Sequence, residues 1–155
     1  MKKILCVLVM SVCAILLCTV CAQASVKVDE EHFPDEVFRE YVSSNFDSDH
    51  DGELSDGEID SVTDLWELSS KGIKSLQGIE YFTALTGLSC NYNQLTSLDM
   101  SKNTALTELY CYNNKLTFLD VSKNTALIKL QCRVNQLTEI DMSGHNKLVE
   151  LDCRE

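Results

Sequence analysis

The sequence is poor in several residue types, and each shortage excludes a class of protein. It has one proline and six glycines among 155 residues, which excludes collagen-like and linker-dominated chains. Lysine and arginine number 13 against 24 aspartates and glutamates, so the formal net charge is −11. So little basic surface gives no evident affinity for nucleic acid phosphates. The apolar fraction of 45% nevertheless favours one folded domain of ordinary size.

A long apolar run occurs only at the N-terminus. Residues 1–3 form a short basic start, an uncharged apolar run covers residues 4–20, and small residues follow at Ala22 and Ala24. This order is typical of a secretory signal peptide and predicts cleavage between Ala24 and Ser25. An uncleaved membrane anchor is the alternative, although the run is slightly short for a span. The mature chain is therefore expected to be secreted or held at the cell surface, without a membrane span.

Removal of residues 1–24 leaves four of the eight cysteines, and these recur at a constant interval of 21 residues. Asparagines and leucines recur in step with them. The recurring positions are Cys90, Cys111, Cys132 and Cys153; Asn93, Asn114 and Asn135; and Leu85, Leu106, Leu127 and Leu148. A fixed period with apolar residues at fixed offsets indicates a solenoid of stacked units.

The repeated unit reads L-x-x-L-x-C-x-x-N-x-L-x-x-L in residues 85–98. It resembles the leucine-rich repeat, and the resemblance covers residues 62–155. Leu88 and Cys90 alternate as in a short strand with both side chains inward. The expected fold is an α/β solenoid with a parallel sheet on its concave face and short 3₁₀ or turn segments on its convex side. Ser101 is expected to cap one tight helical turn there.

Residues 64–155 are expected to form repeats of 21–22 residues, the first of which is imperfect. Counting back through the pattern places Trp66 at the position of Leu88 and Leu68 at that of Cys90. Lys71 replaces the recurring asparagine. In the later repeats, this asparagine is expected to be buried and to satisfy backbone groups in the turn after each strand.

The four cysteines are interpreted as small, buried core fillers. Disulfides are disfavoured because side chains in register on parallel strands point the same way. A zinc site would need closely spaced cysteine or histidine pairs, which are absent. A thiol enzyme would need a histidine beside an exposed thiolate, and His32, His50 and His145 share no position with the cysteines.

Residues 47–58 fit the calcium-binding EF-hand loop at each diagnostic position. Alternate carboxylates supply hard oxygens, a glycine permits the sharp turn, and a final glutamate closes the site with two oxygens. The predicted ligands to one Ca²⁺ ion are Asp47, Asp49, Asp51, Glu53 through its backbone carbonyl, and Glu58, with a bridging water at Ser55. Magnesium is less suited because it prefers stricter octahedral geometry. A merely acidic, solvated loop is the alternative.

Helical patterns flank this loop. Acidic residues follow Pro34 in the first turn of an expected helix, whose apolar stripe is Phe38, Val42 and Phe46. A single EF-hand departs from the paired sensor type, so an acidic helix-loop-helix over residues 25–63 would instead cover the exposed end of the solenoid. Bacterial internalin-type surface proteins are similar in placing an EF-hand-like cap before their repeats. The resemblance implies a secreted leucine-rich repeat protein, and we expect calcium to lock its cap.

Exposed strand positions on the concave face include aromatic and basic residues. The candidate ligand-binding residues are Tyr92, Tyr110, Tyr112 and Arg133. Aromatic residues and arginine are enriched at protein-binding sites, and tyrosine rings also stack on sugars. The expected ligand is therefore a protein or a carbohydrate, and isolated surface tyrosines are the alternative interpretation.

The sequence ends at Leu151-Asp-Cys153-Arg-Glu155, inside a strand unit. This favours a truncated chain over one whose open edge is covered by another chain. No nucleophile–base pair, phosphate loop or metal triad supports catalysis. The expected function is a non-catalytic, calcium-binding, leucine-rich repeat module that binds a protein or glycan. The alternative is a spacer or targeting region of a larger surface protein or enzyme.

Overall fold

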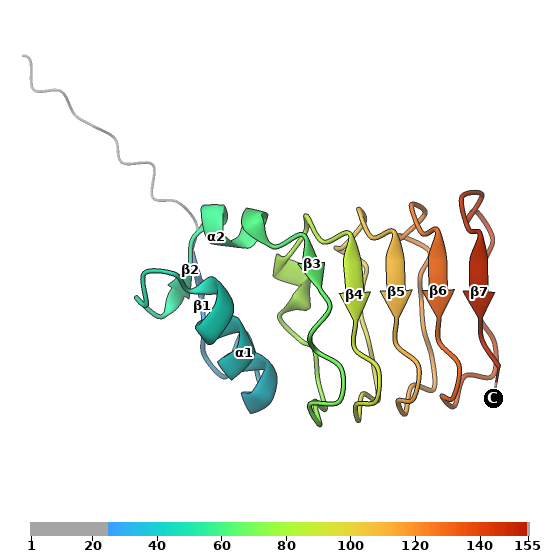
Figure 1. Ribbon diagram of the computed structural model, residues 1–155, viewed down its shortest axis with the longest axis horizontal. Coiled ribbons are helices and arrows are strands. Elements are labelled where there is room, and N and C mark those ends of the chain that lie inside the picture. Colours follow the sequence, from blue (N-terminus) through green and yellow to red (C-terminus); the bar gives the residue numbers. More distant parts are fainter. Residues whose placement is uncertain (1–24, 155) are drawn as a thin grey trace, which may run out of the picture.

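The computed structural model describes residues 25–154, so the predicted signal peptide lies outside the described residues. An N-terminal helical segment is followed by a stack of coils, each contributing one short strand to a sheet (Figure 1). Within the described part of the chain, no helix is long and apolar enough to cross a membrane.

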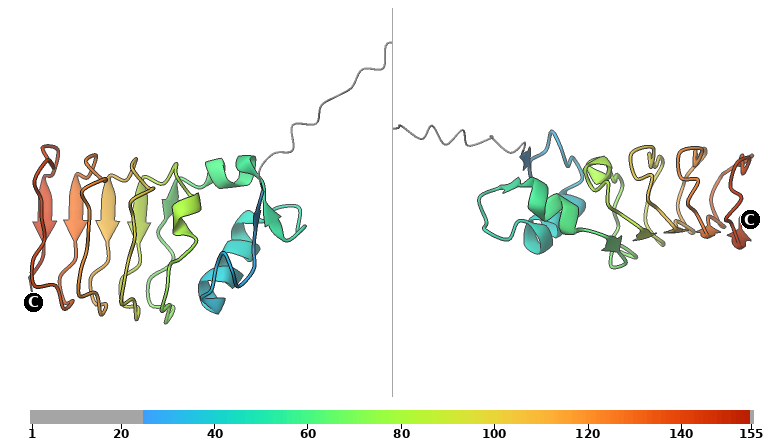
Figure 2. Two further views of the ribbon diagram at one scale, coloured as in Figure 1. Left: turned by 180° about the vertical axis from the view of Figure 1, so that it is seen from behind. Right: turned by 90° about the horizontal axis from the view of Figure 1, so that it is seen from above.

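The sheet is parallel and runs along one side of the stack, as the view from above shows (Figure 2). Its order is β3-β4-β5-β6-β7, so strands that follow one another in the sequence are also neighbours in space. The strands are β3 (Asp64–Leu65), β4 (Gly87–Ser89), β5 (Glu108–Tyr110), β6 (Lys129–Gln131) and β7 (Glu150–Asp152). Leu88 is paired with Leu109, which is paired with Leu130, and all three are fully buried. The expected leucine-rich repeat solenoid is confirmed.

Turns occupy the far side of the later coils, and the one 3₁₀ helix among the described residues, η1 (Ile79–Tyr81), lies in the first coil. Ser101 does not act as the expected helix cap. Instead, the Asp99 carboxylate accepts a hydrogen bond of 2.9 Å from the Ser101 backbone N–H, and Asp120 bonds to Ser122 in the same way. A coil of 21 residues returns to the sheet through turns, which an aspartate two residues upstream stabilises.

The hydrogen bonds of the expected asparagine ladder are confirmed, but only Asn93 is buried, since Asn114 and Asn135 are partly exposed. The Asn93 amide donates to the carbonyls of Leu68 (2.7 Å) and Cys90 (3.0 Å), and its oxygen accepts from the backbone N–H groups of Lys71 and Ile73. One side chain therefore satisfies backbone groups in two successive coils, which holds the coils in register.

A second ladder on the far side was not expected. Asn103 donates to the carbonyls of Ile79 and Phe82 at 2.9 Å, and Asn124 repeats this arrangement one coil later. His145 occupies the third position, where its Nε2 lies 3.0 Å from the Val121 carbonyl. All three side chains are buried. This ladder explains why an asparagine recurs at positions 103 and 124, in the turns on the side of the coils away from the sheet.

The predicted register of the first coil was wrong at Trp66. The sheet pairs Leu65, not Trp66, with Leu88, and Leu65 is fully buried. Leu68 does occupy the expected position beside Cys90, since Asn93 bonds to both carbonyls. The first coil therefore has one extra residue at this point, and Trp66 turns outward.

The N-terminal segment packs on the first coil. Helix α1 (Glu36–Phe46) begins after Asp35, which caps it by accepting from the Phe38 N–H at 3.1 Å. The second Asp35 oxygen accepts from the backbone N–H groups of Lys74 (2.7 Å) and Ser75, which lie in the first coil. Phe33 is fully buried beneath Gly78, and Phe38 and Val42 are buried in the same core. The apolar stripe of the helix therefore covers the end of the solenoid.

Three of the four described cysteines fill the core, and all four are free thiols. Cys90, Cys111 and Cys132 are at most 1% exposed. Burial raises the pKa of Cys90 to about 12 and that of Cys132 to about 11, because a buried thiolate loses its hydration. Burial also raises the pKa of Cys111 well above its usual value. The filler prediction was wrong for Cys153, which is exposed because it lies in the last described coil.

Replacing Asn93 with alanine should destabilise the fold by about 2–4 kcal/mol, because several buried backbone groups would lose their partners. The free energy of unfolding, measured by urea denaturation of the chain from Ser25 onward, checks this. Asn146→Ala is the control, since Asn146 is exposed. Equal losses in the two variants would contradict the role of the ladder.

In the folded chain from Ser25 onward, Ellman's reagent should react rapidly with Cys153 and slowly with the three buried thiols. The reagent requires a thiolate, and both burial and raised pKa values disfavour it at Cys90, Cys111 and Cys132. Unfolding in denaturant should expose all four. Rapid labelling of all four thiols without denaturant would show that the coils open readily.

Candidate functional site

The acidic loop brings together three of its predicted ligands. Carboxylate oxygens of Asp47, Asp49 and Glu58 all lie within 4.8 Å of one another. Asp47 directly follows α1, and Glu58 lies in the first turn of α2 (Asp56–Ser61). The ends of two helices therefore place distant carboxylates at one point.

The loop backbone winds around Asp47. The Asp47 carboxylate accepts hydrogen bonds of 3.1 Å from the backbone N–H groups of Asp51 and Gly52. Gly52 has a φ of 85°, which favours glycine, as expected for the sharp turn at this position. His50 also adopts a positive φ of 58°. The turn is thus wrapped tightly about a buried carboxylate.

Asp51 and Glu53 are not part of this three-carboxylate group. The Asp51 carboxylate accepts from the Glu53 backbone N–H at 2.8 Å, and the Glu53 carboxylate bonds to the Ser25 hydroxyl. Glu53 is predicted to contribute its backbone carbonyl, so the direction of its side chain does not bear on that role. Asp51 would have to turn away from its own loop backbone to join the group.

Glu58 is held by four hydrogen bonds. One of its oxygens accepts from the backbone N–H and hydroxyl of Ser48, both at 2.7 Å, and the other accepts from the same groups of Ser55 at 2.9 Å. The Ser48 hydroxyl bond contributes most to lowering the pKa of Glu58 to about 2, followed by backbone N–H bonds from Ser55 and Ser48. The carboxylate is therefore charged at neutral pH, and it also caps α2.

A short strand pairs with the acidic loop and was not anticipated. Strand β1 (Val26–Lys27) is antiparallel to β2 (Glu53–Leu54), with Val26 opposite Leu54. Leu54 is fully buried. The residue that would contact a second loop in a paired EF-hand is therefore covered by the chain's own N-terminal segment.

Three of the four predicted ligand-binding residues lie together in the segments that directly follow β4, β5 and β6. The rings of Tyr92 and Tyr112 pack edge to face with their centroids 5.3 Å apart. The Arg133 guanidinium lies over the Tyr112 ring, 4.6 Å from its centroid, and is 3.5 Å from the Asp152 carboxylate. Tyr110 belongs to a different aromatic pair.

The partner of Tyr110 is Trp66, which the sequence analysis missed as a surface residue. Their ring centroids are 6.0 Å apart, and Trp66 is 44% exposed. The Tyr110 hydroxyl donates to Glu108 at 2.8 Å, and Glu108 is 3.3 Å from the Lys129 ammonium. Burial, followed by the bond to Glu108, raises the pKa of Tyr110 to about 12. Trp66 was missed because the sequence analysis took Trp66, and not Leu65, as the inward residue of the first strand.

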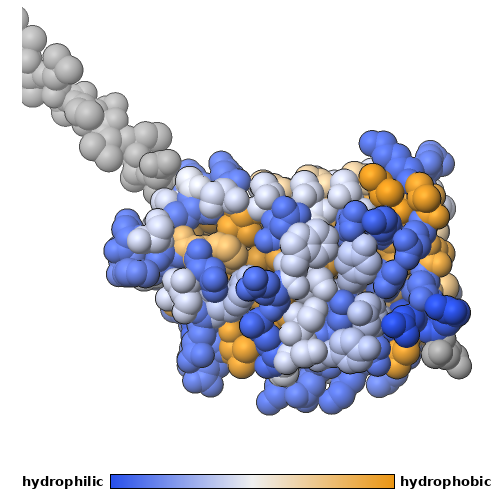
Figure 3. Space-filling view, viewed as in Figure 1, coloured by the Kyte–Doolittle hydropathy of each residue, from blue (hydrophilic) through white to orange (hydrophobic). Residues whose placement is uncertain are grey.

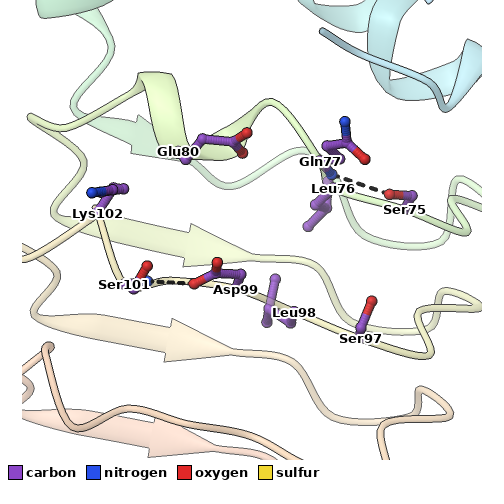
Figure 4. Close-up of a pocket in the computed structure, with 9 residues that line it drawn as sticks. All are labelled: Ser75, Leu76, Gln77, Glu80, Ser97, Leu98, Asp99, Ser101 and Lys102. Atoms are coloured by element: carbon purple, nitrogen blue, oxygen red, sulfur yellow. Dashed lines mark hydrogen bonds between the residues drawn. The ribbon is translucent and has the colours of Figure 1, made fainter. Parts of the chain in front are cut away.

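Clefts also occur on the flank of the solenoid, between successive coils. One cleft of about 330 Å³ is lined by polar residues together with Leu76 and Leu98, and it lies beside η1 (Figure 4). Its polar groups bond within their own turns: Gln77 N–H donates to the Ser75 hydroxyl, and Ser101 N–H donates to Asp99. These bonds stabilise the turns, and the outer sheet face and the acidic loop remain the candidate sites.

The chain is similar to known proteins both in the sequence of its repeats and in its fold. Residues 83–124 match the family model for two copies of leucine-rich repeats. Internalin J of Listeria monocytogenes serotype 4b (strain F2365) is 41% identical over 72 residues, which make up 46% of this chain and 8% of that protein.

Solved internalin structures share the fold. The functional domain of InlJ from Listeria monocytogenes, described as including a cysteine ladder, has a TM-score of 0.77 and 37% identity over 87% of this chain and 30% of its own. For an internalin (InlF) from strain 4b F2365, the values are 0.72 and 26%, over 85% and 39% of the two chains. Internalin C2 from the same strain has the same fold, with a TM-score of 0.71 and 24% identity over 83% and 58%. The chain thus spans less than two thirds of each relative, contains leucine-rich repeats, and is similar to bacterial internalins.

Proposed function

We propose that the chain is a non-catalytic ligand-binding module of an exported bacterial surface protein. The observation that carries this proposal is the gathering of four exposed or partly exposed aromatic rings and Arg133 along the sheet side of the solenoid. Similarity to internalins supports a location outside the cell. Residues 1–24 would act as the signal peptide.

The sheet face is suited to binding because its side chains are already fixed. Arg133 is held between the Tyr112 ring and the Asp152 carboxylate, so little rotamer entropy remains to be lost when a ligand binds. Tyrosine and arginine are frequent at sites that contribute most of the binding free energy. The ligand would be a protein or a glycan on the surface of another cell.

We also propose that residues 47–58 bind one Ca²⁺ ion. The donor set fits a hard cation, since Asp47, Asp49 and Glu58 offer charged oxygens within 4.8 Å of one another. Asp51 and the Glu53 backbone carbonyl would complete the set. Calcium is favoured over magnesium because it accepts more ligands in a flexible geometry. Glu58 would have to give up hydrogen bonds from Ser48 to offer both oxygens to the ion.

The ion would stabilise the contact between the helical segment and the solenoid. Three clustered carboxylates repel one another unless a cation neutralises them. The loop joins α1, whose cap Asp35 bonds to the first coil, and α2, which leads into β3. Neutralising the loop would therefore strengthen the cover over the apolar end of the stack.

A second candidate function is a spacer or targeting region within a larger surface protein or enzyme. The relatives favour it in one respect, because the matching part of this chain is equivalent to only 8% of internalin J. In that case the sheet face would hold no ligand of its own.

Adding millimolar calcium to the chain from Ser25 onward should raise its unfolding temperature by a few degrees. A dissociation constant of about 10⁻⁴ to 10⁻³ M and about 10 mM calcium correspond to roughly 1.4–2.7 kcal/mol of stabilisation. Calorimetry with and without calcium measures the difference. Asp49→Asn and Glu58→Gln should abolish it.

Asp60→Asn is the matched control, because Asp60 is an exposed carboxylate of the same helix as Glu58 and lies outside the three-carboxylate group. It should keep the calcium-dependent shift. Since Glu58 also caps α2, only the difference between calcium-loaded and calcium-free samples is compared. Equal unfolding temperatures of the parent in both conditions would contradict the metal proposal.

Fluorescently labelled chain from Ser25 onward should be retained on intact epithelial cells or on isolated bacterial cell walls. Tyr112→Ala and Arg133→Ala should each weaken retention about fivefold or more, because they remove rigid side chains from the ligand-binding face. Phe118→Ala is the control, since Phe118 is 65% exposed but lines a flank cleft. Retention that is insensitive to the sheet-face variants would favour the spacer function.

A further inference from the structure

One part of the sheet face has a composition unlike the rest. The rings of Trp66 and Tyr110 meet above β4, and their planes are tilted by 57°. Between them, β4 presents only the small residues Gly87 and Ser89. We call these two rings, with the β4 surface beside them, the Trp66–Tyr110 platform.

Gly87 is what allows this platform to form. A Cβ atom at this position would lie 2.2 Å from the Trp66 ring and 2.7 Å from the Asp64 carboxylate. Any larger residue would displace the indole from the sheet. The Trp66 ring therefore packs closely against Gly87 while it remains 44% exposed.

Uncharged hydrogen-bonding groups adjoin the rings. The hydroxyls of Ser69 and Ser89 are 2.9 Å apart, and the Asn91 amide donates to the Ser89 hydroxyl at 2.9 Å. The Asn91 oxygen accepts from the Tyr112 backbone N–H at 3.2 Å. Each hydroxyl offers one donor and two acceptor lone pairs, so this network keeps capacity for a ligand's own hydroxyl groups.

The Tyr110 side of the platform has its charged groups in pairs, whereas the Asp64 carboxylate lies beside Gly87 on the other side and the whole chain carries −11. Glu108 is paired with Lys129 at 3.3 Å and also accepts from the Tyr110 hydroxyl. Arg133 is paired with Asp152. A charged ligand would have to compete with these pairs, whereas a neutral ligand would leave them intact.

Exposed aliphatic residues lie elsewhere on the molecule. Ile128 precedes β6, Val149 precedes β7, and Leu151 is within β7. Figure 3 shows pale residues over the middle of the sheet side, with orange residues at both ends, toward β7 and toward the N-terminal segment. Aromatic residues are also enriched at protein interfaces, but the fully buried centre of such an interface is more apolar than the rest of the surface. The platform instead combines aromatic rings with hydroxyl and amide groups.

We propose that the Trp66–Tyr110 platform binds a neutral oligosaccharide. The C–H face of a sugar ring carries partial positive charge and packs on the negative face of an aromatic ring. The sugar hydroxyls would bond to the partly exposed hydroxyls of Ser69 and Ser89, and the buried Asn91 amide holds Ser89 in place. This proposal rests on the proposed ligand-binding function of the sheet face and specifies the ligand class.

The protein contains a single tryptophan, so a change in its fluorescence reports on the Trp66–Tyr110 platform alone. Neutral oligosaccharides of glucose, N-acetylglucosamine, galactose or mannose are titrated into the chain from Ser25 onward, and the tryptophan emission is recorded. At least one should shift the emission with a saturable dose dependence. Tyr110→Ala should weaken this binding about fivefold or more, because it removes one of the two rings. Phe118→Ala should leave it unchanged.

Trp66→Ala lacks the fluorescent reporter, so its binding to the same oligosaccharide is measured by calorimetry and should also be lost. Circular dichroism of both platform variants checks that the fold is retained. If no neutral oligosaccharide perturbs Trp66, or if binding survives both substitutions, the glycan proposal is overturned. If that happens while cell retention still depends on Tyr112 and Arg133, the ligand-binding function stands and its ligand is not a neutral glycan.

Discussion

Hydrogen bonds from buried asparagines to the backbones of two neighbouring coils determine most other features of this molecule. The Asn93 amide alone bonds to carbonyls of two coils and to the N–H groups of Lys71 and Ile73 in the turn of the first coil. Because buried backbone groups must be satisfied, a coil that shifted by one residue would lose several of these bonds at once. The register of the sheet follows from this constraint, and the rows of side chains on its outer face follow from the register.

A second ladder on the far side of the solenoid satisfies buried backbone carbonyls with different residues, although the side-chain oxygens of Asn103 and Asn124 have no partner of their own among the described residues. Asn103 and Asn124 satisfy carbonyls of the preceding turns, and His145 takes their place in the last described coil. One ladder follows the strands and the other lies on the opposite side of the solenoid, so neighbouring coils are bonded to each other on both sides. Leucines and thiols fill the space between them, where no polar group would find a partner.

The repeat period was sufficient to predict the solenoid, its strands and the first ladder, since the residues at Leu88, Asn93 and their equivalents are identical from coil to coil. The first coil was predicted less well because 23 residues separate Leu65 from Leu88, two more than the repeat period, and a register shift of one position changes which side chain faces outward. Trp66 was misplaced for this reason. Asn103 was read as part of a helical turn because its partners lie in another coil. Strand β1 could not be predicted, since two residues carry no periodic signal.

The acidic loop was recognised by its spacing, and the structure gathers Asp47, Asp49 and Glu58 while Asp51 bonds to its own loop.

The parallel register of identical coils also bears on how such a protein can change over evolution. A duplicated or deleted unit of 21 residues would find the same hydrogen-bonding partners on either side and would leave its neighbours undisturbed. Each added unit would lengthen the molecule by about 5 Å, one strand spacing. Residues on the outer surface of a unit could diversify freely, while its asparagines could not.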